Sequence, residues 1–145
     1  QHGASVVVAN AVTADDFFEA KAAVPDLRLT FDTGNCAMGE DPAISLRRCI
    51  SDVVHVHAKD YEIRESMFSG SRQGRNGQWF RPTLHGRGNV DLGGIIGVLA
   101  DLSYDQYICI EYASKDLRPD EGIRCSARYI QRLIDRIAIE RTENS

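Results

Sequence analysis

The sequence has 145 residues, of which 43% are hydrophobic and 26% charged; this excludes a disordered chain and is typical of a soluble globular domain. A formal net charge of −4 argues against a nucleic-acid partner, for which a basic patch is expected. No apolar run approaches the about 20 residues that cross a bilayer, so no membrane partner is expected.

Strands and helices are predicted to alternate along the chain. The first strand is a β-branched run at residues 5–9, of the kind found in buried parallel strands. Thr13 and Asp16 have the spacing of a capping box, which predicts a helix over residues 14–24 that ends at Pro25. Further strands are expected at residues 27–31, 53–57 and 107–111, and further helices from Asp41-Pro42, from Asp91 and over residues 120–139.

Hydrophobic spacing predicts which side chains are buried. The second helix would bury Ile44 and Cys49, and the last helix would bury a stripe that includes Ile123 and Ala127. Cys109 lies in an apolar strand and is expected to be a small core residue. No CxxC pair occurs among the four cysteines, so a structural zinc site is not expected. We expect free thiols and a reducing cytoplasm.

Residues 69–89 form a long stretch that is too polar and too rich in glycine for a regular element. Loops of this length inside compact domains are usually functional. The remaining order of elements predicts an α/β fold built from parallel (β/α) units with right-handed crossovers. In such folds the carboxyl ends of the strands form the active-site face.

Three predicted strands finish in a possible metal ligand, namely Asp32, His57 and Glu111. Two carboxylates and one imidazole form a mixed oxygen and nitrogen set that suits Mn²⁺, Mg²⁺, Co²⁺ or Zn²⁺. The alternative for Asp32 is an N-cap of the next helix, and the alternative for His57 is an ordinary polar side chain. Glu111 follows apolar residues, so its carboxylate needs a partner or a metal.

Several neighbouring polar residues are further candidates. His55 lies two residues before His57 and so points to the same side of the strand. It would be an outer-shell residue of the metal site or a packing residue. Lys59 and Asp60 would lie at the rim, where they bind substrate or form a solvated ion pair. Arg81 and Arg87 flank the glycine-rich stretch and would hold a substrate hydroxyl or phosphate, unless they are ordinary surface arginines.

Taken in order, these segments resemble the second half of xylose isomerase-like TIM-barrel proteins, a superfamily of sugar isomerases, epimerases and dehydratases that also includes a DNA-repair endonuclease. The resemblance covers nearly the whole chain and is carried by FDTGN at 31–35, GEDP at 39–42, HVHAKD at 55–60, GRGNVD at 86–91, YD at 104–105 and IE at 110–111. It implies that the chain is one domain, residues 1–145, forming the four-stranded C-terminal half of a (β/α)₈ barrel. Because a closed barrel takes about 250 residues, we expect a fragment completed by an N-terminal half, or a homo-oligomer.

The resemblance also implies residue roles. Asp32, His57 and Glu111 would bind a divalent metal ion, and Glu111 would double as the acid/base group. Asn35 stands where relatives place a residue near the substrate. The family carries a metal-binding glutamate where this chain has Ala9, followed by Asn10, whose side chain would offer an oxygen but cannot carry a proton.

The resulting functional expectation is a metal-dependent sugar or sugar-phosphate isomerase or epimerase with a small sugar or polyol substrate. The alternatives are a dehydratase of the inosose or dehydroshikimate type and a noncatalytic remnant that binds carbohydrate or assembles with a partner. The alanine at position 9 favours the remnant, whereas the three retained ligands favour an enzyme.

Overall fold

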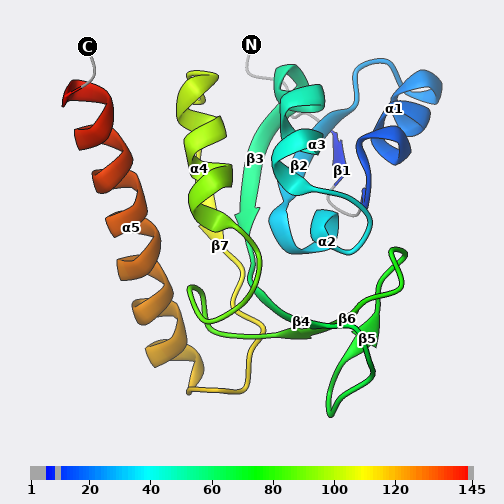
Figure 1. Cartoon of the computed structure of the whole chain (residues 1–145). Helices are drawn as coiled ribbons and strands as arrows, with labels where there is room; N and C mark the ends of the chain where they lie inside the picture. The colour runs from blue at the N-terminus through cyan, green and yellow to red at the C-terminus, as the bar shows by residue number, and fades with distance from the viewer. Residues whose placement is uncertain (1–5, 9–10, 144–145) are drawn as a thin grey trace.

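A parallel sheet forms the centre of the computed structural model, which describes residues 6–8 and 11–143 (Figure 1). Its strand order is β1-β2-β3-β7, and every neighbouring pair is parallel. The predicted parallel α/β architecture is therefore confirmed. The strands are β1 (Val7–Val8), β2 (Arg28–Asp32), β3 (Val53–Ala58) and β7 (Ile108–Ile110).

Helices pack against one face of this sheet, as the alternating order of elements requires (Figure 1). Alternate strand residues such as Phe31 and Val56 join the core with Leu46 of α3 and Ile95 of α4. The helical segments are α1 (Ala14–Ala23), α2 (Thr33–Ala37), α3 (Pro42–Cys49), the 3₁₀ turn η1 (Ile50–Asp52), α4 (Leu92–Asp101) and α5 (Pro119–Glu143). None of the described helices is long and apolar enough to cross a membrane.

The predicted helix starts are confirmed by side-chain caps. Thr13 and Asp16 form the reciprocal capping box of α1. Asp41 accepts a hydrogen bond from the amide of Ile44 (2.9 Å) at the start of α3, and Asp91 caps α4 in the same way.

Two predicted buried faces are wrong in part. Ile44 is 63% exposed, because α3 buries Ser45, Leu46 and Cys49 instead. In α5, Ile123 and Ala127 face solvent. The helix buries a face that starts with Gly122, where an added Cβ would lie 2.2 Å from the Tyr112 ring. The buried face of α5 consists of Gly122, Ser126, Ile130 and Leu133.

The stretch predicted to lack regular structure contains most of a small antiparallel sheet. Its strands are β4 (Tyr61–Arg64), β5 (Arg72–Gln73) and β6 (Trp79–Pro82), in the order β4-β6-β5, and we call them the hairpin sheet. Phe80 is fully buried and packs edge-on against Tyr61, with ring centroids 5.8 Å apart. This aromatic pair joins the hairpin sheet to the core, so residues 69–89 are not simply a polar loop.

The cysteines provide a test of this packing. Burial raises the pKa of Cys36 and Cys49 to about 12, whereas Cys109 and Cys125 are exposed, so the expectation that Cys109 is a core residue is wrong. Because the thiolate is the reactive form, we predict that a thiol reagent at neutral pH modifies two cysteines quickly and all four only after unfolding. Replacing both exposed cysteines by serine should remove the fast phase. Fast labelling in that double variant would contradict the described packing.

Candidate metal and acid–base site

The three predicted ligands converge at the carboxyl end of the parallel sheet. Asp32 ends β2 directly opposite His57 of β3, and Glu111 follows β7, the strand on the other side of β3. The Nδ1 atom of His57 lies 3.1 Å from Oε2 of Glu111 and 4.0 Å from Oδ2 of Asp32. One ligand atom from each residue lies within 4.8 Å of the other two. We call these three residues the carboxylate cluster.

Asp32 is an N-cap, as one of its two predicted alternatives has it, and the same side chain also faces His57. Its Oδ1 atom accepts a hydrogen bond of 2.8 Å from the amide of Asn35 and so caps α2, while its Oδ2 atom faces His57. The side chain is only 2% exposed. The cap therefore fixes the carboxylate in one orientation and leaves the other oxygen for the site.

Lys59 is buried and contacts the carboxylate cluster, so it is not a rim residue in solvent. Its Nζ atom donates a hydrogen bond to Glu111 and lies 3.6 Å from Oδ2 of Asp32. Its backbone is held by Thr33, whose hydroxyl accepts from the Lys59 amide (2.9 Å) and donates to the Lys59 carbonyl (2.8 Å). The sequence suggested no role for Thr33, because nothing in its spacing shows that it joins the start of α2 to the residue after β3.

The electrostatics of the two carboxylates differ. Burial raises the pKa of Asp32, and the amide of Asn35 and the charge of Lys59 only partly offset this. Burial acts in the same direction on Glu111, but the hydrogen bond from Lys59 and the other neighbouring groups lower its pKa below the ordinary value. Glu111 is therefore ionised at neutral pH and can accept a proton.

The donor set fits a hard or borderline divalent cation. Two carboxylates and one imidazole are the ligand types that such ions prefer. His57 and Glu111 keep 28% and 38% of their side-chain surface exposed, so an ion has an open approach. The ammonium group of Lys59 would compete with such an ion for the two carboxylates.

The remaining predicted site residues are not members of the carboxylate cluster. Asn35 is half-buried at the start of α2, beside a surface hollow of about 260 Å³. Arg81 forms an ion pair with Glu62 and lines another hollow, of about 500 Å³, together with Lys115. No contact joins Arg81 to the carboxylate cluster within the described residues, and Asn10 lies outside those residues together with Ala9. Arg87 is exposed.

Asp60 is turned into the protein, where it holds the segment after the hairpin sheet. Its Oδ2 atom accepts hydrogen bonds from the amides of Gly86 (2.9 Å) and Gly88 (3.0 Å), and its Oδ1 atom accepts from Val90 (3.3 Å). It is 2% exposed, and a Cβ on Gly88 would lie only 2.0 Å from its Oδ1 atom. A role in substrate binding remains a prediction, but its contacts position this loop.

We predict that Asp60→Ala destabilises the chain by about 2–4 kcal/mol, because the amides of Gly86, Gly88 and Val90 lose their acceptor and that of Val90 is buried. Urea unfolding measures the free energy, and Asp105→Ala, at an exposed aspartate, is the control. Equal stability of the two variants would contradict the anchoring role.

A second prediction concerns Lys59 and a divalent ion. Lys59→Met should lower the melting temperature without metal, because two carboxylates lose their shared cation. It should also increase the affinity for Mn²⁺ by about tenfold, or about 1.4 kcal/mol, because the competing charge is gone. Calorimetric titration measures this affinity, with Lys115→Met as the surface control. An unchanged or weaker Mn²⁺ affinity in Lys59→Met would contradict the competition.

Comparison with known proteins gives relatives of one kind. The family described as xylose isomerase-like TIM barrel matches residues 2–133. An inosose dehydratase of Clostridium tetani (strain Massachusetts / E88) is 29% identical over 112 residues, which cover 71% of this chain and 37% of that protein. The chain thus spans little more than a third of this relative.

Solved structures show the same fold at lower identity. A D-tagatose 3-epimerase-like protein superposes with a TM-score of 0.67 and 19% identity, covering 89% of this chain and 43% of that one. A xylose isomerase-like TIM barrel protein from Mycobacterium smegmatis, solved in complex with magnesium, gives a TM-score of 0.64 and 20% identity, covering 86% and 40%. The described parallel sheet and its helices therefore correspond to part of a barrel.

Proposed function

The chain belongs to the xylose isomerase-like TIM barrel family, and on this premise we propose that it forms the metal-binding half of an enzyme that removes a proton next to the carbonyl group of a sugar or cyclic polyol. The observation that carries the proposal is the convergence of Asp32, His57 and Glu111 within 4.8 Å. The other half of the barrel would come from a further segment or a second copy.

The residues of the site have different roles in the proposed reaction. Asp32, His57 and Glu111 would hold a divalent ion, whose Lewis acidity makes the C–H bond next to a bound carbonyl more acidic. Glu111 takes the proton, because its side chain is 38% exposed whereas that of Asp32 is 2% exposed. Lys59 stabilises the negative charge that develops on the substrate, because its ammonium group already lies between the two carboxylates. Asn35, Asp60 and Arg81, with Asn10, are proposed to contact the substrate.

Dehydration is the reaction that we favour. The relative with 29% identity is an inosose dehydratase, and elimination requires only one base. Glu111 removes the proton, the electron pair of the broken C–H bond forms a C=C bond, and the C–O bond on the next carbon breaks. The departing hydroxyl takes a proton from Lys59 and leaves as water. Epimerisation by two bases would need a second carboxylate, and position 9 carries alanine.

An aldose–ketose isomerase is the second candidate. This reaction also needs a single base, because one carboxylate can take a proton from one carbon and return it to the neighbouring carbon. Glu111 is the carboxylate of the cluster with an exposed side chain, at 38%, and so offers such a base.

Incubation of the assembled barrel, with its other half present, with an inosose and with ketoses in D₂O and Mn²⁺ separates these possibilities. A dehydratase forms a product that has lost one water, as mass spectrometry detects. An isomerase or epimerase forms a product with the atoms of the substrate and no loss of water, which carries solvent deuterium to the extent that the transferred proton exchanges. If neither product forms with any substrate, although the protein binds Mn²⁺, the noncatalytic remnant is favoured and the proposal fails.

We predict that Glu111→Gln lowers turnover by at least about 100-fold, because the amide cannot accept a proton. Its circular dichroism spectrum should match the parent protein, since residue 111 is only half-buried. Glu121→Gln, at an exposed position of α5, is the matched control and should keep full activity. Retained turnover in Glu111→Gln would remove the acid/base role.

A further inference from the structure

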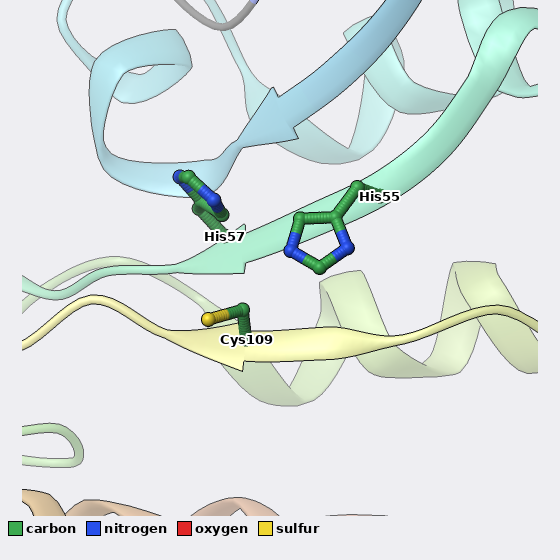
Figure 2. Close-up of side chains that lie close together, drawn as sticks. All are labelled: His55, His57 and Cys109. Atoms are coloured by element: carbon green, nitrogen blue, oxygen red, sulfur yellow. The ribbon is translucent and has the colours of Figure 1, made fainter. Parts of the chain in front are cut away.

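A second group of ligand atoms lies on the same face of the sheet as the carboxylate cluster. His55 and His57 project from one face of β3, and Cys109 projects from the neighbouring strand β7 (Figure 2). One ligand atom from each lies within 4.8 Å of the other two. We call these residues the histidine–cysteine cluster.

Sheet geometry explains why these side chains meet. His57 and Cys109 are direct partners in the parallel register of β3 and β7. His55 lies two residues earlier on β3, so its side chain points to the same face as that of His57. The two imidazole rings lie 5.2 Å apart between centroids and are nearly perpendicular, at 84°.

The cluster has free donor atoms and an open approach. Cys109 is exposed and both histidines are half-buried. Within residues 6–8 and 11–143, neither the His55 ring nor the Cys109 thiol makes a hydrogen bond, whereas Nδ1 of His57 lies 3.1 Å from Oε2 of Glu111. Two imidazoles and one thiolate form a softer ligand set than the carboxylate cluster, and such sets favour Zn²⁺, Co²⁺ and Cu²⁺ over Mg²⁺ and Mn²⁺.

We propose that His55, His57 and Cys109 form a second metal site, selective for thiophilic divalent ions, which competes with the carboxylate cluster for His57. The two ligand sets share this one imidazole. Two divalent ions bound around one neutral imidazole would repel each other strongly at such short range. Zn²⁺ at the histidine–cysteine cluster therefore withdraws His57 from the carboxylate cluster and weakens Mn²⁺ binding there.

The test uses the whole chain and Co²⁺, whose absorption spectrum depends on the ligands that bind it. Bound Co²⁺ should show the near-ultraviolet charge-transfer band of a cobalt–thiolate bond. Cys109→Ser should abolish the band, decrease Zn²⁺ affinity by at least about tenfold and leave Mn²⁺ affinity unchanged. Cys125→Ser, at an exposed cysteine on α5, is the matched control and should keep the band.

Two further variants test the sharing of His57. His55→Gln should weaken Zn²⁺ alone, whereas His57→Gln should weaken both Zn²⁺ and Mn²⁺. Saturating Zn²⁺ should also decrease the Mn²⁺ affinity of the parent chain, and this effect should disappear in Cys109→Ser. A cobalt complex without the thiolate band, or a band that persists in Cys109→Ser, would overturn the proposal. These readouts involve no substrate, so their result is independent of the proposed reaction.

Discussion

The ammonium group of Lys59 compensates two carboxylates that the parallel sheet brings together at its carboxyl end. Asp32 is almost fully buried, and a carboxylate in such a position is costly unless a positive charge or hydrogen bonds offset its lost hydration. Lys59 supplies that charge, and Thr33 holds the Lys59 backbone in place. One ammonium group thus offsets part of the negative charge of two carboxylates, and a bound cation has to share these carboxylates with it or displace it.

Much of the fold follows from local sequence patterns. The alternation of elements and the caps at Thr13, Asp41 and Asp91 depend on neighbouring residues, and convergence at the carboxyl ends of strands is a general property of parallel sheets. The hairpin sheet was missed because its strands have only two to four residues, too few for an alternating pattern to stand out within a glycine-rich stretch. The surroundings of Lys59 were missed because reaching a carboxylate 52 positions later depends on the three-dimensional distance.

The same sheet face also explains how one imidazole comes to serve two chemically different ligand sets. Successive residues on one face of a strand are two positions apart, so the side chains of His55 and His57 lie on the same face of β3. Asp32 lies beside His57 on β2, and Cys109 lies beside it on β7. Asp32, His57 and Cys109 are register partners at one level of the sheet, and His55 lies one step deeper on the same face. The two ligand sets therefore differ in which neighbours of His57 they use.

β3 continues almost directly into β4, with only Lys59 and Asp60 between them. Within this short connection the chain passes from the charge-balancing lysine to the aspartate that holds residues 86–90 and then to Tyr61 in the core. Because only two residues separate the two strands, one short stretch of backbone sets both the place of the Lys59 ammonium group beside Glu111 and the course of residues 86–90.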